Sequence, residues 1–325
     1  MAQMKYYYEL TISSSPHVHS PVTTQTIMRD VLIALAPAMV GSVVFFGARA
    51  LTVTLVSVLA CVFFEWAYCR LMHKHCKVYD LSAVVTGVLL AFVCPPTIPY
   101  WILIIGDFFA IILVKMLFGG IGRNIVNPAL AARAFMFSWP VAMSTWIKAG
   151  WENQASLFSS ADIVTAATPL ASMHQGVFDP AAGTVRDMFF GNVGGCIGET
   201  SAALLLVGFV YLLVRKVITW HTPVVFIATV FVLYLAFTGD VMMAVSQILA
   251  GGLFIGAIFM ATDYVTTPIT TRGRVVFALG CGVITFIIRY FCAYPEGVSF
   301  SILIMNILTP FIEKWTAKEP LGGVK

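Results

Sequence analysis

The stretch DIVTAATPL, residues 162–170, carries the most distinctive chemistry of this 325-residue chain. It lies in a long polar interruption of an otherwise apolar sequence. The hydroxyl of Thr168 follows two alanines and is sterically open, so another protein's active site could esterify it. The pattern is equally typical of a helix N-cap, where Asp or Thr precedes an apolar turn. The residues alone favour the cap and leave modification of Thr168 open.

Acidic side chains also fall inside apolar stretches, at Glu65, Asp107, Glu199 and Asp263. An ionisable group inside a membrane is expensive, so its default interpretation is functional. Asp107, the nearest to the centre of its stretch, and Glu65 are therefore candidates for an ion pathway. The alternative is structural, with each acid paired to Arg133 or to a helix end.

The segment FGGIGRN, residues 118–124, is a Gly-rich turn ahead of an expected helix. Such a turn favours either phosphate binding at the helix N-terminus or close helix packing. It is not a dinucleotide fingerprint, because no strand precedes it. Asn124 and Asn127 place amides in or near the membrane, where unpaired polar groups cost several kcal/mol. These amides need a partner, either broken-helix backbone or a bound polar ring.

Several chemistries find no support in the sequence. No nucleophile and base stand in a recognisable pattern, so we expect no catalytic residue in this chain. The seven cysteines form no C-x-x-C pair, and Cys69, His73, His75 and Cys76 lack zinc-ligand spacing, so we expect no metal site. The basic residues are dispersed without interleaved aromatics, which argues against a nucleic-acid partner.

The elements that carry these residues are expected to be membrane helices. The chain is 59% hydrophobic and 10% charged, whereas a soluble domain carries roughly 25% charged residues. A spanning helix needs about 20 mostly apolar residues. We predict an all-α integral membrane protein with about ten transmembrane helices, near residues 28–47, 50–69, 80–96, 99–118, 126–147, 192–213, 222–238, 241–260, 274–292 and 298–315.

The distribution of Lys and Arg predicts the orientation. With the N-terminus inside, the outer segments hold only Arg49, Lys148, Arg186 and Arg289, while every other loop cation lies inside. Both termini are then cytoplasmic and the polar loop lies on the outer face. The predicted organisation is a cytoplasmic segment, a first membrane half, an extracytoplasmic loop, a second membrane half and a cytoplasmic tail, at 1–27, 28–147, 148–190, 191–316 and 317–325.

A faint internal repeat links the two membrane halves. Residues 118–130 and 294–310 each place Gly-rich or Pro/Gly backbone ahead of an asparagine, Asn127 or Asn306. Two five-helix halves with an odd helix count would be inverted relative to each other, as in many transporters. The sequence suggests such an inverted repeat.

The motif formed by Asp162, Thr165, Ala166, Ala167 and Thr168 resembles the flavin-attachment motif of the NqrB/RnfD family. SSSPH (13–17), IMRDVLIALAPA (27–38), FGGIGRNIVNPALAARAF (118–135) and ATDYVTTP (261–268) follow in the family's order, so the resemblance covers nearly the whole chain. It implies that Thr168 carries FMN through a phosphoester, loaded by a flavin transferase, with Asp162 and Thr165 as parts of the attachment motif. Many members have glycine where this chain has Ala166.

The resemblance also implies a second, non-covalent flavin of riboflavin type near the inner face. Asn124, Asn127 and Asp263 are the residues expected around it. The flavin on Thr168 is expected on the outer face, which agrees with the side that the charge distribution gives independently.

The implied function is that of a cell-membrane subunit of an Rnf-type complex. Such a complex passes electrons between ferredoxin and NAD⁺ and moves Na⁺ or H⁺, with the ferredoxin and NAD sites on partner subunits. The alternatives are a B-type subunit of a Na⁺-translocating NADH:quinone reductase, which the short N-terminal segment disfavours, and a solute channel or transporter. The outer-loop motif has no use in a transporter.

Overall fold

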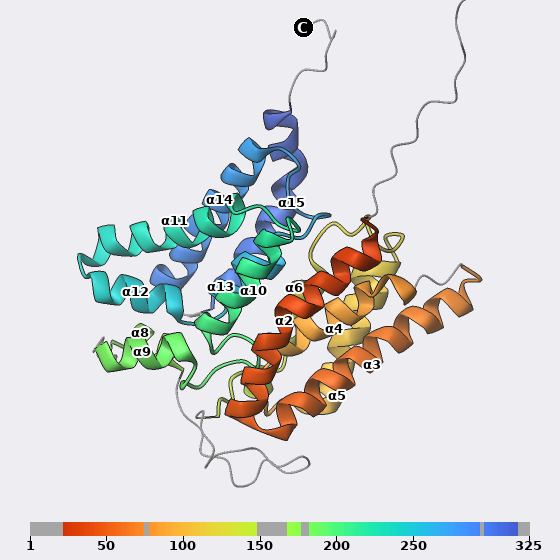
Figure 1. The fold of residues 1–325 in the computed structure, drawn as a ribbon, viewed down its shortest axis with the longest axis horizontal. Coiled ribbons are helices and arrows are strands. Elements are labelled where there is room, and N and C mark those ends of the chain that lie inside the picture. Colours follow the sequence, from red (N-terminus) through yellow and green to blue (C-terminus); the bar gives the residue numbers. More distant parts are fainter. Residues whose placement is uncertain (1–21, 75–77, 148–167, 177–181, 293–295, 318–325) are drawn as a thin grey trace, which may run out of the picture.

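The computed structural model describes residues 22–74, 78–147, 168–176, 182–292 and 296–317. Every regular element in these ranges is a helix (Figure 1). The first half comprises α2 (Thr24–Phe46), α3 (Ala48–Leu71), the 3₁₀ turn η1 (Val78–Asp80), α4 (Ser82–Phe92), α5 (Tyr100–Phe108), the π-helix η2 (Phe109–Met116), α6 (Pro128–Met136) and α7 (Pro140–Met143).

Two short helices, α8 (Pro169–His174) and α9 (Ala182–Phe190), connect the halves. The second half comprises α10 (Ala202–Val214), α11 (His221–Thr238), α12 (Val241–Leu249), α13 (Leu253–Ile255), the π-helix η4 (Gly256–Met260), α14 (Thr271–Phe291) and α15 (Val298–Thr316). In Figure 1 the first half forms one bundle and the second half another beside it, with α8 and α9 at one end of the second bundle.

Five of these helices, α2, α3, α11, α14 and α15, are long and apolar enough to cross a membrane. A sixth span is formed if α12 and the α13–η4 segment, which meet at a bend of 65°, are taken together. The chain is therefore a multi-pass membrane protein. The described helices support five or six full spans, fewer than the ten that the apolar stretches suggested.

Of the four remaining predicted spans, the fourth forms α5 and η2 over residues 100–116, and the other three are shortened for identifiable reasons. The third ends as α4 at Phe92, ahead of Pro95 and Pro96, since a residue before proline disfavours helical backbone. The fifth is split into α6 and α7 by Pro140. The sixth becomes helical only at Ala202, after an irregular buried segment.

Two irregular segments, residues 93–98 and 193–201, meet inside the protein. The amides of Ile197 and Gly198 donate to the carbonyls of Cys94 and Phe92 at 3.0 and 2.9 Å. Arg49 Nε donates to the carbonyl of Pro96 at 2.8 Å. Non-helical backbone at membrane depth is tolerated only when protein or a cavity satisfies it. The hydrogen bonds of Ile197 and Gly198 therefore join the two halves where their helices are broken, and Arg49 holds the broken segment within the N-terminal half.

Two ends of the molecule differ in the segments that they hold. One end, which we call the cavity end, gathers the start of α2 and α4, the end of η2 and the segment after η4 around one cavity. The opposite end holds the start of α3 and the segments before α10 and α15. The sequence assigns the cavity end to the cytoplasm, and that assignment stays a prediction.

Helices α2 and α10 pack through a glycine. A β-carbon at Gly208 would collide with the carbonyl of Ala34 and lie 3.0 Å from the Phe259 ring. Close helix approach through small residues is characteristic of membrane proteins. Gly208 therefore brings α2 and α10, one helix from each half, into close contact.

We predict that Gly208→Val lowers the thermal stability of the purified protein. Overpacking a tight interface costs typically about 1–3 kcal/mol. The measurement is the unfolding temperature in detergent, followed by size-exclusion chromatography of heated samples. The control is Val207→Leu, a neighbour whose side chain is 56% exposed. Equal unfolding temperatures for Gly208→Val and the wild type would show that α2 and α10 do not pack as described.

Candidate functional site

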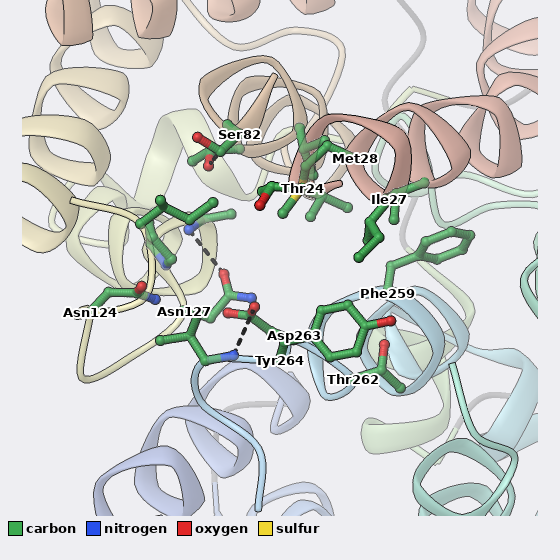
Figure 2. A pocket seen from close by; sticks show the side chains of 18 of the residues that line it. Thr24, Ile27, Met28, Ser82, Asn124, Asn127, Phe259, Thr262, Asp263 and Tyr264 are labelled. Carbon is green, nitrogen blue, oxygen red and sulfur yellow. Dashed lines mark hydrogen bonds between the residues drawn. The ribbon is translucent and has the colours of Figure 1, made fainter. Parts of the chain in front are cut away.

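A cavity of about 400 Å³ lies between the two halves at the cavity end (Figure 2). Its walls are mostly apolar, with polar groups from both halves. The residues that line it include Thr24, Ile27, Met28, Ser82, Lys115, Gly122, Asn124, Asn127, Phe259, Thr262, Asp263 and Tyr264. Sites for small organic ligands are commonly of this size and character.

Two π-helical segments, η2 and η4, both end at this cavity. Lys115 comes from η2, and Ile258 and Phe259 come from η4. π-Helical turns are rare and occur frequently at functional sites. The loop between η2 and α6 completes the wall, and it turns through Gly119, Gly120 and Gly122, all at positive φ.

Asn127 joins the cavity wall to the second half of the chain. Its Oδ1 accepts from the amides of Ala129 and Leu130 at 3.0 and 3.3 Å, so it caps α6 ahead of Pro128. Its Nδ2 donates to the Met260 carbonyl at 3.4 Å. The Asn127 backbone amide donates to Asn306 Oδ1 at 3.1 Å when the Asn306 amide is oriented to satisfy its neighbours. The two asparagines of the faint repeat thus lie in contact.

Asp263 faces the same cavity from the segment between η4 and α14. It accepts from the Val265 amide and from Thr266 Oγ1, each at 3.4 Å. Burial raises the pKa of the Asp263 carboxyl above its ordinary value, opposed by hydrogen bonding from Val265, Thr266 and Asn124. The structure therefore brings together Asn124, Asn127 and Asp263, which the motif resemblance grouped around one ligand.

Lys115 is a site residue that was not predicted from the sequence. Its charge was counted with the cytoplasmic loops, but its side chain is buried and reaches Glu65 at 3.0 Å and Ser82 Oγ at 2.6 Å. Glu65, a candidate for the ion pathway, is thus held in a buried ion pair. The position of Lys115 at the end of the predicted span 99–118 gave no sign of a buried partner.

Asp107 is fully buried in α5, away from the cavity wall. Its Oδ1 accepts from Ser57 Oγ at 2.6 Å and from Cys61 Sγ at 3.2 Å. Its Oδ2 has no hydrogen-bond partner among the described residues. Of the two acids predicted for an ion pathway, Asp107 is thus the one with an open carboxylate oxygen.

Thr168 caps α8, as the helix-cap interpretation expects. Its Oγ1 accepts from the Ala171 amide at 3.2 Å, and Pro169 occupies the first helical position. Leu170 and Met173 of α8 pack on Met188 and Ala250 in a small core of their own. The partners in the motif, Asp162 and Thr165, lie outside the described residues.

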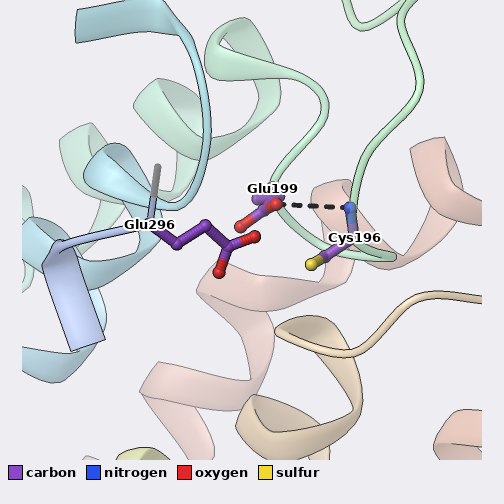
Figure 3. Close-up of side chains that lie close together, drawn as sticks. All are labelled: Cys196, Glu199 and Glu296. Carbon is purple, nitrogen blue, oxygen red and sulfur yellow. Dashed lines mark hydrogen bonds between the residues drawn. The ribbon is translucent and has the colours of Figure 1, made fainter. Parts of the chain in front are cut away.

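Buried charges lie beside Thr168 at the opposite end. A small pocket lined by Thr168 also contacts Glu199 and Glu296. Figure 3 shows Cys196, Glu199 and Glu296 together, their ligand atoms within 4.8 Å of one another, a spacing compatible with a metal ion. Arg133 supplies positive charge there, since its guanidinium pairs with Glu296 and donates to Ser299 Oγ and Cys196 Sγ at 3.2 and 3.6 Å.

Glu199 was expected within a span, and pairing of Arg133 with one of the membrane acids was the structural alternative to an ion pathway. Glu199 in fact lies in the irregular segment ahead of α10, and its Oε1 accepts from the Cys196 amide at 3.3 Å. Arg133 forms its ion pair with Glu296, which the sequence did not single out. A lone cation inside an apolar stretch was the signal that such an acid existed.

These features define a multi-pass membrane protein with an internal cavity at one end and buried ion pairs at both. The chain belongs to the NQR2, RnfD, RnfE family, whose model matches residues 11–322.

Curated relatives match over nearly the whole chain. The D-type subunit of a Na⁺-translocating ferredoxin:NAD⁺ oxidoreductase complex from Acetobacterium woodii is 44% identical, covering 97% of this chain and 96% of the relative. Its counterpart in a proton-translocating ferredoxin:NAD⁺ oxidoreductase complex from Clostridium ljungdahlii is also 44% identical, covering 96% of both. The D-type subunit of an ion-translocating oxidoreductase complex from Halorhodospira halophila is 37% identical, covering 96% and 95%.

We predict that removing one partner of the buried Glu65–Lys115 pair destabilises the protein more than removing both. A buried charge left without its partner costs about 3–5 kcal/mol, whereas replacing both charges can be nearly neutral. Glu65→Gln and Lys115→Met are compared singly and together by thermal unfolding in detergent. Additive losses in the double variant would mean that the two side chains are not coupled.

Proposed function

We propose that this chain is the D-type membrane subunit of an ion-translocating ferredoxin:NAD⁺ oxidoreductase complex. In this proposal it relays electrons between FMN on Thr168 and a second, riboflavin-type flavin in the 400 Å³ cavity. The observation that carries it is the meeting of Asn124, Asn127 and Asp263 on the wall of that cavity, in a family member whose Thr168 lies at the other end.

The position of Thr168 fits a covalently held flavin. The residue is half-buried beside the small pocket of Glu199 and Glu296. Its capping bond uses Oγ1 as an acceptor, and an ester oxygen also accepts a hydrogen bond, so capping and esterification are compatible. A flavin supplies one-electron and two-electron chemistry when bound, while the protein sets its position and potential. The covalent bond to Thr168 keeps the flavin at its position in the electron relay.

The cavity fits a non-covalent isoalloxazine ring. Its apolar wall, with Ile27, Met28 and Phe259, shields a flat aromatic ligand from water. Asn124 and Asn127 offer amides near the polar edge such a ring presents. Lys115 lines the same wall, and its ammonium is held there by the buried ion pair with Glu65.

Ion translocation is assigned to the whole complex. The Na⁺-translocating and the proton-translocating relatives are equally similar to this chain, so overall identity does not select the ion. We propose Asp107, with its open Oδ2, as the ion-pathway residue of this chain. Glu65 contributes through its pair with Lys115. We place the outer face of the cell membrane at the Thr168 end.

The quinone reductase alternative falls within the same family, since the family model includes NQR2. The relatives at 44% identity are named for ferredoxin and NAD⁺, and this favours the ferredoxin-linked complex. The other subunits of such a complex and a flavin transferase are the partners that the proposal requires.

We predict that Thr168→Ala abolishes covalent flavin. The protein is co-expressed with a flavin transferase, denatured, separated on a gel and examined for flavin fluorescence. The wild type should be fluorescent and Thr168→Ala dark. Ser172→Ala, which removes a hydroxyl from the same helix, is the matched control and should stay fluorescent. A fluorescent Thr168→Ala band would place the attachment elsewhere.

We also predict that filling the cavity expels the second flavin without affecting the first. Met28→Trp adds bulk to the cavity wall, and Met28→Leu nearly conserves its volume. Flavin released by denaturation should fall well below one per chain in Met28→Trp, with Met28→Leu unchanged. Gel fluorescence from Thr168 should persist in both. Full retention of releasable flavin in a folded Met28→Trp protein would contradict the placement.

A further inference from the structure

A second cavity, of about 210 Å³, lies at the opposite end beside α8. It is formed by α8, α11, α12 and α14 and is distinct from the small pocket in which Glu199 and Glu296 lie. Its lining includes Gln247 of α12 and Arg289 of α14. Arg289 was expected to be an outer loop charge, whereas it lies buried in the last turn of α14.

Arg289 is rigidly held but not fully satisfied. One terminal nitrogen donates to the Gln247 carbonyl at 2.7 Å and the other to the Ala250 carbonyl at 3.2 Å. These are the carbonyls at the end of α12, which a cation stabilises. Within the described ranges the Nε–H has no hydrogen-bond partner, and Arg289 enters none of the ion pairs found there.

Gln247 also carries a buried polar atom without a hydrogen-bond partner among the residues described, in this case an acceptor. Its side chain is buried, and its Oε1 accepts no hydrogen bond from the described part of the chain. An unsatisfied buried polar atom is destabilising, so two of them in residues of one cavity wall call for an explanation. Both residues line the cavity, so a small turn of either side chain would present its unpartnered donor or acceptor to whatever enters.

The other walls suit a flat aromatic ring. Tyr234 is buried and Tyr290 is partly exposed, and both line the cavity with the apolar Leu170, Met173 and Met243. His174, which is exposed, marks an opening toward solvent. The pyrimidine edge of isoalloxazine carries carbonyl acceptors and one N–H donor, which complement Arg289 Nε–H and Gln247 Oε1.

The cavity also lies within reach of Thr168. At about 1.5 Å of rise per residue, Leu170 and His174 lie roughly 3 and 9 Å along the helix from Thr168. Leu170 lines both this cavity and the small pocket that holds Thr168. A flavin attached through its phosphate would have its five-carbon chain to cover that distance.

We propose that this cavity receives the isoalloxazine ring of the flavin on Thr168, with Arg289 and Gln247 as the residues that bind its polar edge. This inference rests on the proposed function. Arg289 then acts as more than a helix cap, because its positive charge favours the anionic reduced ring. A tenfold preference for the reduced over the oxidised flavin corresponds to about 30 mV for a two-electron couple.

The test measures how far the flavin ring is exposed in the folded complex. Iodide is added to the detergent-solubilised complex, and the flavin fluorescence absent from Thr168→Ala is taken as the signal of the Thr168 flavin. Met243→Trp fills the cavity, and Val241→Trp, on the exposed face of α12, is the matched control. Gln247→Leu removes the open acceptor while its backbone carbonyl still holds Arg289.

We expect the wild-type ring and the Val241→Trp ring to be shielded from iodide. Met243→Trp should raise the quenching constant several-fold, with gel fluorescence from Thr168 unchanged, and Gln247→Leu should raise it less. A flavin that is present on Thr168 but quenched in the wild type as strongly as free FMN would overturn the cavity assignment and leave the proposed function intact. Absence of flavin from wild-type Thr168 would overturn both.

Discussion

The structure depends on satisfying backbone polar groups that no helix satisfies within the membrane. Segments 93–98 and 193–201 break the helical run in each half, and they are joined by hydrogen bonds such as the one from the Ile197 amide to the Cys94 carbonyl. The side chain of Arg49 satisfies a further carbonyl in the first of these segments, that of Pro96. Because the breaks are satisfied across the two halves, the halves must dock in one register, and this register shapes the space between them.

Buried charged side chains must also be satisfied, and this holds at both ends of the molecule. Lys115 and Glu65 pair near the cavity, and Arg133 and Glu296 pair beside the Thr168 pocket. Each cation is balanced by its paired carboxylate, so these ion pairs hold the walls of the two proposed flavin sites without adding net charge there. Arg289 is different, because it enters no ion pair among the described residues and its Nε–H has no hydrogen-bond partner there.

Much of the helical organisation could be predicted from apolar runs, including the bounds of α3 and α15 to within a few residues. Thr168 and the grouping of Asn124, Asn127 and Asp263 came from motif resemblance, and the shared cavity wall brings the last three together. The break at residues 193–201 was missed because this segment runs into the apolar stretch of α10 with no proline to mark a boundary. Lys115 and Arg289 were counted with the segments outside the membrane, whereas both side chains are buried. The sequence shows a charge near a helix end but does not show the buried group with which it interacts.

The central claim is that one chain holds two flavins in two different ways, and a flavin count on the purified complex tests it most directly. After acid denaturation, the flavin released from this subunit is measured by chromatography, and the flavin kept on its peptides is located by mass spectrometry. The account predicts one releasable flavin per chain and one FMN on the peptide that contains Thr168. A subunit with no peptide-bound flavin, or with FMN on another residue, would contradict it.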